Sequence, residues 1–494
     1  MRRIGLALVG ALLCLATLLT APSFAAPADE KRVITWKPCP EDAAVQCGTI
    51  KLPVDWSKPG GPLFELALAR RAATGVSKGP LFINPGGPGG SGVSMTLSAP
   101  ARFSPALLQS FDIIGIDPRG VARSHPVVCT AAAMNQPGNR IMPGNAAEFA
   151  ELVAFNRQLA ADCRRETGPL FDHVDSRSVA RDVDAVRAAL GAEKLNWYGA
   201  SYGTLMGQMY AELFPGRIRA MVNDGNMDHS LDIDRFIRSD SAFAEDSYNQ
   251  FVAWCNQSAN CELHGEDVKA VFADLLRRAD AGTLADPADG RPISNWDLLD
   301  VTQFYFNRPR WVELGKLLAS LNTGVPAFRS LSTDLVEDVR PQFCQDWAVP
   351  IKTYDELDRL YQATRKEAPG MRASVIALAS STQCVGRPGK VNNPQHPLKV
   401  IGAPKILMLN GVHDPATGYA WAENVKRQLG DTAVLVTYEG AGHVAYTRNT
   451  CTRAAVDAYL LDLTIPADGT RCPASNPALT TTLTADPTDL TTRW

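Results

Sequence analysis

Residues 199–203 place a serine hydroxyl where it could act as a nucleophile, because they read Gly-Ala-Ser-Tyr-Gly. This Gly-x-Ser-x-Gly pattern directly follows an apolar run at 195–198 and precedes a segment, 204–210, that can begin a helix. A strand that runs straight into a helix forces the serine into a strained turn, and the flanking glycines let neighbouring backbones approach without a Cβ clash. We therefore predict that the Ser201 hydroxyl stands clear of a sheet, available for covalent catalysis.

A serine nucleophile needs an adjacent base that is itself oriented by an acid, and after such a turn both follow the serine in the chain. His443 is the predicted base, because it follows an apolar strand and the small residues Gly-Ala-Gly. The alternative for His443 is a surface-loop histidine. Asp414 is the predicted acid, since it begins a turn-forming Asp-Pro after the apolar run 405–410. Asp224, after the run 218–222, is the rival acid.

The oxyanion of a tetrahedral intermediate needs two backbone N–H donors. One predicted donor is the amide of Tyr202, directly after the serine and favoured by the helix dipole. The other is expected from the glycine-rich loop 84–92, with Gly87 as the preferred donor and Gly86 as the alternative. A phosphate-binding loop is disfavoured, because no Gly-Lys-Ser/Thr follows these glycines. This chemistry requires no metal and no cofactor.

Alternating strands and helices must position these groups. Residues 179, 183, 186 and 190 form one apolar stripe, which predicts a helix over 179–190. Strand–helix alternation predicts a mainly parallel sheet with helices on both faces. The turn 117–120, Asp-Pro-Arg-Gly, is expected to be an ion-paired support of the site. Apolar runs predict strands at 64–71, 80–84, 111–117, 195–198, 218–222, 405–410 and 433–438.

The segment 227–403 breaks this alternation, because it is rich in helical pattern and aromatic residues and holds four cysteines. We predict that it is a largely helical cap insertion over the catalytic face. The core then comprises 26–226 and 404–464. The last stretch, 465–494, is rich in Thr, Pro, Asp and Ala, and is predicted to be an extended or mobile C-terminal tail. A chain of 494 residues has room for this organisation in one large domain or in two.

The first residues are typical of a secretory signal peptide, predicted over 1–25. Arg2 and Arg3 are basic, residues 4–20 are apolar, and 23–25 read Ser-Phe-Ala. No other run reaches the roughly 18 apolar residues of a membrane helix, so no membrane anchor is expected after cleavage. The predicted location is therefore extracellular, with retention at the cell wall left open. A net charge of −3 without a Lys/Arg run gives no reason to expect nucleic-acid binding.

Cysteine usage agrees with export. Of eleven cysteines, Cys14 lies in the predicted signal peptide, which leaves ten. No Cys-x-x-Cys pair suggests zinc, and free buried thiols are the alternative to disulfides. Pairing of neighbours is the simplest prediction, and it gives Cys39–Cys47, Cys129–Cys163, Cys255–Cys261, Cys344–Cys384 and Cys451–Cys472.

These motifs together resemble the secreted tripeptidyl aminopeptidases of actinomycetes, in the proline iminopeptidase-like group of α/β-hydrolases. The matching segments are 84–92, 117–120, 199–203, 224–225, 414–417 and 440–443, and the resemblance spans essentially the whole mature chain. It implies an α/β-hydrolase fold, with Ser201 as nucleophile, Asp414 as acid and His443 as base. Gly418 departs from the family pattern, in which proline is common, and Asn223 stands where leucine is commoner.

The resemblance implies release of short peptides, often tripeptides, from free N-termini. Recognition of a substrate ammonium calls for carboxylates in the cap, and Glu245 and Asp246 are the candidates; the alternative is that both are solvated helix charges. The alternative function is a secreted carboxylesterase or lipase with the same triad. A catalytically silent binding protein is disfavoured because serine and histidine are both kept, and an epoxide hydrolase or dehalogenase because the turn carries no aspartate. We expect a monomer.

Overall fold

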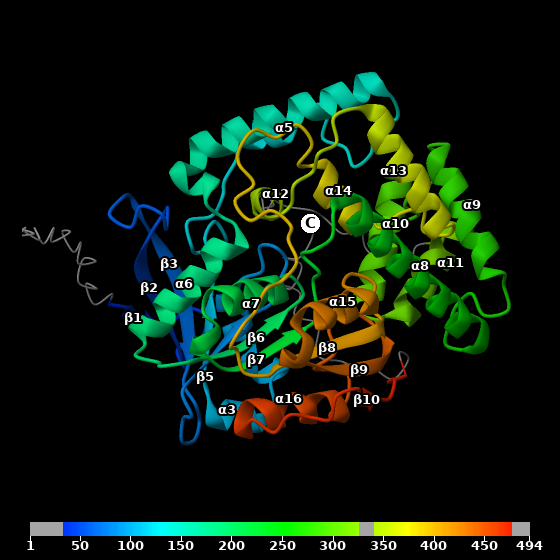
Figure 1. The fold of residues 1–494 in the computed structure, drawn as a ribbon. Helices are drawn as coiled ribbons and strands as arrows, with labels where there is room; N and C mark the ends of the chain where they lie inside the picture. Colours follow the sequence, from blue (N-terminus) through cyan, green and yellow to red (C-terminus); the bar gives the residue numbers. More distant parts are fainter. Residues whose placement is uncertain (1–32, 326–339, 477–494) are drawn as a thin grey trace, which may run out of the picture.

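A ten-stranded sheet runs through the part of the chain that the computed structural model describes, residues 33–325 and 340–476 (Figure 1). The predicted signal peptide and the predicted tail beyond residue 476 lie outside the described residues. The strand order is β1-β2-β3-β5-β4-β6-β7-β8-β9-β10. The strands are β1 (Thr35–Pro38), β2 (Val45–Pro53), β3 (Leu63–Arg71), β4 (Pro80–Asn84), β5 (Asp112–Ile116), β6 (Leu195–Ala200), β7 (Ile218–Asp224), β8 (Ile406–His413), β9 (Ala433–Ala441) and β10 (Arg471–Cys472).

From β5 to β10 all neighbouring strands are parallel, which confirms the predicted mainly parallel sheet. The first three strands are antiparallel to their neighbours, and the sequence prediction missed β1 and β2. Buried and exposed residues mostly alternate along β2, because one of its faces is solvated. Polar residues therefore interrupt its apolar pattern, and no continuous apolar run marks it.

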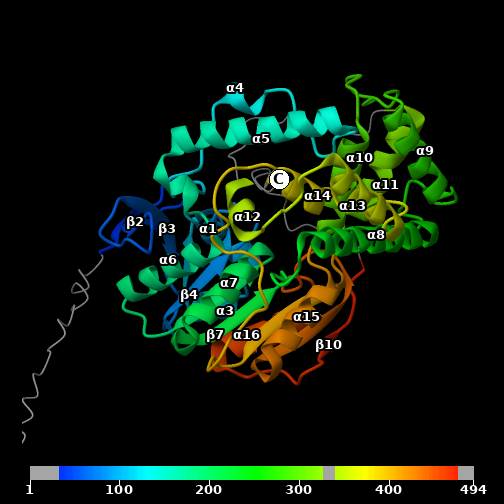
Figure 2. The ribbon, with the colours of Figure 1, turned by 45° about the horizontal axis from the view of Figure 1, so that its top comes forward.

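Helices cover both faces of this sheet (Figures 1 and 2). On one face α1 to α3 and α16 pack around an apolar cluster that includes Phe103 and Tyr459. On the other face α6, α7 and α15 pack around a cluster that includes Trp197 and Trp421. The helices outside the segment between β7 and β8 are α1 (Gly92–Leu97), α2 (Ala99–Arg102), α3 (Pro105–Ser110), α4 (Ala131–Met134), α5 (Ala146–Thr167), α6 (Ser176–Ala189), α7 (Tyr202–Leu213), α15 (Tyr419–Leu429) and α16 (Thr450–Asp462).

The described residues between β7 and β8 are largely helical, and we call this segment the cap. Its aromatic residues, among them Tyr248, Phe251 and Phe272, form an apolar cluster of their own. In Figure 2 the long helix α8 lies at the base of the cap, next to α15. The predicted helical insertion is therefore present. Its helices are α8 (Ile233–Gln257), α9 (Val268–Asp280), α10 (Asn295–Asn307), α11 (Trp311–Thr323), α12 (Arg340–Asp346), α13 (Tyr354–Glu367) and α14 (Val375–Thr382).

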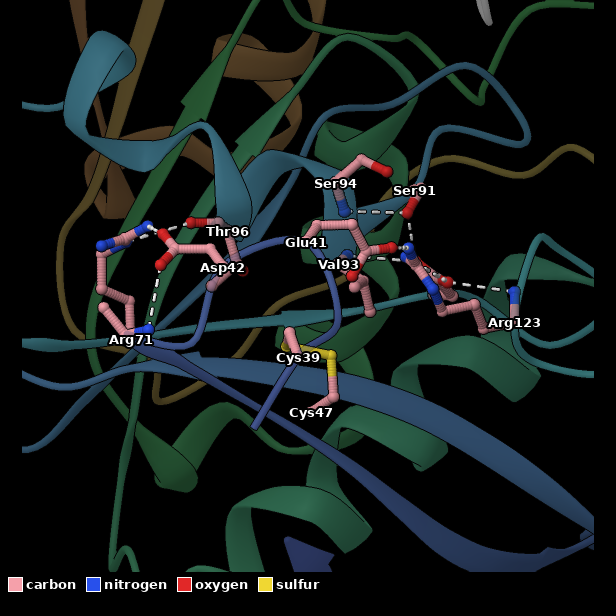
Figure 3. The surroundings of a disulfide bond; sticks show 12 residues. Cys39, Glu41, Asp42, Cys47, Arg71, Ser91, Val93, Ser94, Thr96 and Arg123 are labelled. Carbon is pink, nitrogen blue, oxygen red and sulfur yellow. Dashed lines mark hydrogen bonds and ion pairs between the residues drawn. A yellow bond between two sulfur atoms is a disulfide. The ribbon is translucent and has the colours of Figure 1, made fainter. Parts of the chain in front are cut away.

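Five disulfides join neighbouring cysteines, which confirms the predicted pairing. They close segments of 6 to 40 residues. The Cys39–Cys47 bridge joins the residue after β1 to β2. Two ion pairs lie beside it, Arg71–Asp42 and Arg123–Glu41, each with N and O atoms 2.5 Å apart (Figure 3). Among the described residues no disulfide joins the cap to the core.

Residues 465–476 depart from the expectation of an extended or mobile tail. Within them β10 pairs with β9, with Arg471 opposite Thr437 and Cys472 opposite Tyr438. The buried Cys472 is also bonded to Cys451 on α16. The disulfide and the strand pairing anchor residues 465–476 to the sheet edge. The composition of this stretch predicted a mobile tail because it offers few other residues to bury.

Candidate active site

Ser201 occupies a strained turn between β6 and α7. Its φ of 56° and ψ of −126° lie where residues other than glycine are uncommon. Its amide donates to the Asp224 carbonyl of the neighbouring strand at 2.8 Å. A Cβ atom added to Gly203 would lie 2.8 Å from Asn84 Oδ1, so the helix start and the end of β4 touch where only glycine fits. This is the turn geometry that the sequence motif predicts.

His443 and Asp414 lie in contact at the carboxyl ends of β9 and β8. Each carboxylate oxygen of Asp414 is 3.0 Å from His443 Nδ1. Asp414 is buried and accepts hydrogen bonds from the amides of Ala416, at 3.0 Å, and Thr417, at 2.9 Å. Thr417 Oγ1 also lies 3.2 Å from Asp414 Oδ2 and 3.3 Å from His443 Nδ1. The arrangement engages Nδ1 with an acid and leaves Nε2 for proton transfer.

The histidine ring lies beside the strand end that holds Ser201. Ala200 is paired with Asp224 across β6 and β7, and a Cβ atom added to Gly225, the next residue, would lie 3.2 Å from His443 Cε1. Within residues 33–325 and 340–476, neither Ser201 Oγ nor His443 Nε2 has a hydrogen-bond partner. Both groups are free to meet each other or a substrate, and such contacts often tighten only when substrate binds.

Asp224, the rival acid, has a different set of partners. Its two oxygens accept the amides of Ala445, at 2.7 Å, and Tyr446, at 2.9 Å, together with the Tyr198 hydroxyl at 2.9 Å. Burial raises the pKa of Asp224, which these three donors partly oppose. No hydrogen bond joins it to His443 in the described part of the chain. Asp224 instead fixes the loop that follows the histidine.

The Tyr202 amide and the glycine-rich loop lie beside the serine. Tyr202 is the first residue of α7, where a helix leaves its amide N–H without an intrahelical acceptor. A Cβ atom added to Gly86 would lie 2.9 Å from this nitrogen, so the glycine-rich loop touches the turn. The Gly86 amide is occupied, because it donates to Asn84 Oδ1 at 2.9 Å. The Gly87 amide has no partner among the described residues, which favours Gly87 over Gly86.

The Tyr202 side chain anchors the turn to the cap. Its hydroxyl donates to Asp346 Oδ2 on α12 at 2.6 Å. Asp346 also accepts from Ser176 Oγ, at 2.6 Å, and Asn393 Nδ2, at 2.8 Å. Burial, together with the charge of Asp175, raises the pKa of Asp346 to about 7. Sequence reasoning missed this group, because Asp346 lies 144 residues from Tyr202 and no local pattern marks it.

The turn 117–120 supports the glycine-rich loop. Asp117 Oδ1 accepts hydrogen bonds from Ser91 Oγ at 2.5 Å and from the Val93 amide at 3.0 Å. Ser91 and Val93 are labelled in Figure 3. Arg119 makes the ion pair that the sequence suggested, with Asp182 on α6 as its partner at 2.6 Å. Both of these side chains are fully buried. The turn thus stabilises the loop from beneath and faces no solvent.

The two cap carboxylates have separate roles. Glu245 is buried, and its Oε2 accepts the amides of Gly370 at 2.9 Å and Met371 at 2.8 Å. Asp246 Oδ2 lies 2.7 Å from Nδ1 of His413, the residue before Asp414. Adjacent residues on a helix point in different directions, so the structure brings only Asp246 to the acid loop. These contacts favour Asp246 over Glu245 as the predicted substrate-binding residue, since the Glu245 carboxylate holds a cap loop.

Gly418, the departure from the family pattern, makes room for the cap. A Cβ atom at this position would lie 2.3 Å from three ring atoms of Phe243 on α8. We expect Gly418→Ala to lower the free energy of unfolding by about 1–3 kcal/mol, because the ring has to shift. Urea denaturation measures this. Gly216→Ala is the matched control, with nothing within 4 Å of the new atom, and an equal loss in both variants would contradict the steric explanation.

The ranges 33–325 and 340–476 contain no group of His, Cys, Asp or Glu side chains placed to hold a metal ion. No helix in these ranges is long and apolar enough to cross a membrane.

Known proteins are similar to this chain over most of its length. The model of the family described as TAP-like protein matches residues 372–472, which contain Asp414 and His443. The serine protease Hip1 of Mycobacterium tuberculosis is 31% identical over 89% of this chain and 91% of its own. Carboxylesterase B of the same organism is 32% identical over 89% of each chain. The tripeptidyl aminopeptidase of Streptomyces coelicolor is 28% identical over 87% of this chain and 84% of its own. The chain therefore belongs to the TAP-like family of α/β-hydrolases and is a hydrolase.

Proposed function

We propose that this chain is a secreted serine exopeptidase that releases short peptides, in particular tripeptides, from free N-termini. The contact of Asp414 with His443 Nδ1, beside the strained Ser201 turn, is the observation that carries the proposal. Relatives named serine protease and tripeptidyl aminopeptidase support a peptide substrate. The predicted signal peptide and the five disulfides support export to an oxidising compartment.

The proposed reaction is acyl transfer through a covalent intermediate. His443 Nε2 takes the Ser201 proton as Oγ attacks the scissile carbonyl, and Asp414 stabilises the imidazolium. The amides of Tyr202 and Gly87 donate to the oxyanion of the tetrahedral intermediate. His443 then gives its proton to the leaving amine, which departs. Water hydrolyses the ester on Ser201 by the same steps, with His443 again acting as the base.

Asp246 is the proposed partner of the substrate ammonium. It lies on the cap helix α8, its side chain is 43% exposed, and its contact with His413 sets it next to the acid loop. A carboxylate in this position could bind the charged end of a peptide whose scissile bond lies at Ser201. Glu245 is left out of the proposal, because its carboxylate is already bonded to two amides.

A secreted carboxylesterase or lipase is the alternative, favoured by the 32% identity to a relative named carboxylesterase B. Both functions would use the same triad and the same oxyanion donors. The two functions differ in whether the cap recognises an ammonium group. A comparison of peptide and ester substrates therefore distinguishes them.

The deciding experiment compares three substrates on the purified mature protein: Ala-Pro-Ala p-nitroanilide, its N-acetylated form and a short-chain nitrophenyl ester. We expect the free-amine peptide to react at least about thirtyfold faster than the acetylated one, since losing an ammonium–carboxylate contact that the bound substrate buries costs about 2 kcal/mol or more. Asp246→Asn should raise KM for the free amine and leave ester hydrolysis unchanged. Turnover of the ester alone would establish the esterase and refute the peptidase.

A further inference from the structure

Helix α10 belongs to the cap, yet its last turn contacts both loops that carry the predicted acid and base. Gln303 and Asn307 lie on this helix four residues apart, and therefore on the same face. Gln303 contacts the loop of Asp414, and Asn307 contacts the loop of His443. These loops are separated from α10 in sequence by more than a hundred residues.

Gln303 ties the acid loop to the cap. The residue is 1% exposed, and its Nε2 donates to the carbonyl of Pro415, the residue after Asp414, at 3.3 Å. The same nitrogen donates to Ser374 Oγ at 2.9 Å, and Oε1 accepts the Val375 amide at 3.0 Å. A side chain whose donor and acceptor are both engaged holds one orientation, and its loss would leave buried groups without partners.

The carbonyl of Asn307 ties the histidine loop to the same helix end. It accepts the His443 amide at 2.8 Å and Arg448 Nη2 at 2.9 Å. Arg448 Nη2 also donates to the His443 carbonyl at 2.6 Å, and Arg448 Nε donates to the Val444 carbonyl at 2.9 Å. Arg448 therefore cross-links the histidine loop and the cap.

The turn that Arg448 holds is strained. Val444 has a φ of 56°, a region that β-branched residues seldom adopt. Such a conformation persists only where its surroundings fix it. Burial lowers the pKa of Arg448, but a guanidinium stays charged in proteins, and charge-assisted hydrogen bonds to carbonyls are stronger than neutral ones. The hydrogen bonds of Arg448 thus hold Val444 in its strained conformation, directly after His443.

We propose that the last turn of α10 positions the acid and the base, with Gln303 and Arg448 as positioning residues. The cap then completes the active site as well as covering it. This rests on the proposed function only in taking Ser201, Asp414 and His443 as the triad. A cap movement that withdrew α10 would break the bond from the His443 amide to Asn307, so the catalytic step requires α10 in place.

The test uses Arg448→Met and Gln303→Leu in the full mature protein. Two rates are measured: kcat and KM on the free-amine tripeptide nitroanilide, and the rate of covalent labelling by diisopropyl fluorophosphate. Labelling requires an activated serine but no peptide recognition.

For Arg448→Met we expect kcat and the labelling rate to fall together by about tenfold to a hundredfold, because a small displacement of a catalytic group has effects of this order. KM should change little. Gln303→Leu should change both rates in the same direction, and Arg448→Lys should recover part of the loss.

Arg310→Met is the matched control, because Arg310 is an exposed arginine just after α10 that pairs with Glu313. It should keep both wild-type rates. Folding is checked by near-UV circular dichroism and thermal unfolding, and rates are taken well below each unfolding temperature.

Wild-type rates in folded Arg448→Met and Gln303→Leu would overturn the proposal; if Arg448→Met does not fold, Gln303→Leu decides alone. A wild-type protein that is labelled but cleaves no peptide refutes the peptidase, and the labelling rates still test α10. A wild-type protein that is never labelled overturns both.

Discussion

Ser201→Ala is expected to lower turnover of the peptide substrate by about a millionfold, the loss seen when a triad nucleophile is removed. No other hydroxyl occupies the turn between β6 and α7, so no acyl-enzyme can form. The fold should be unaffected, because Ser201 Oγ has no hydrogen-bond partner among the described residues and its removal strands no buried group. The measurements are the initial rate of nitroanilide release and the extent of labelling by diisopropyl fluorophosphate.

Ser94→Ala is the control for this variant, because Ser94 is an exposed serine on α1, the helix that follows the glycine-rich loop. It should retain full activity and full labelling. The free energy of unfolding of both variants should stay within about 0.5 kcal/mol of the wild-type value. Activity of folded Ser201→Ala above a thousandth of the wild-type rate would show that another residue is the nucleophile.

Asp414→Asn is expected to lower kcat by about four orders of magnitude. Asparagine can keep the hydrogen bonds from the Ala416 and Thr417 amides through its carbonyl oxygen, so the loop should survive. Its neutral amide cannot stabilise a positive imidazolium, and its NH₂ group favours the His443 tautomer that has the proton on the wrong nitrogen. Steady-state kinetics over a range of pH measures the effect.

Asp224→Asn distinguishes the two carboxylates. The NH₂ group of the new asparagine would face the backbone N–H of Ala445 or of Tyr446, each of which now donates a hydrogen bond to Asp224. Two donors would then oppose each other. We therefore expect lower stability in urea and a smaller loss of kcat than in Asp414→Asn. If the folded Asp224→Asn variant lost four orders of magnitude and Asp414→Asn did not, the assignment of the acid would be reversed.

Local sequence patterns were sufficient to predict the Ser201 turn and the loops at the ends of the strands. The Ser201 turn, the glycine-rich loop and the Asp-Pro turn each depend on residues within a few positions, and glycine and proline mark such conformations directly. The sequence favoured Asp414 over Asp224 through its Asp-Pro turn alone, because both residues follow apolar strands. Only their hydrogen bonds to His443 Nδ1 and to the amides of Ala445 and Tyr446 separate them.

Contacts between distant segments could not be predicted in the same way. Tyr202 meets Asp346 across 144 residues, Gln303 meets Pro415 across 112, and Glu245 meets Gly370 across 125. The first two pairings depend on how the cap packs on the core, and the third depends on how the cap folds on itself. No local sequence preference encodes any of them. The adjacent charges Glu245 and Asp246 illustrate the limit, since the sequence predicted one role for both and the helix turns them to different partners.

The spacing of the disulfides has a consequence for how the chain can be oxidised. The five bridged segments follow one another without overlap or nesting. When such a chain meets an oxidant from its N-terminal end onwards, the first cysteine of each bridge is followed next by its native partner. Wrong pairs form when thiols of different bridges are exposed together and then have to exchange. Vectorial oxidation of this chain can reach the native pairing with no isomerase-catalysed reshuffling.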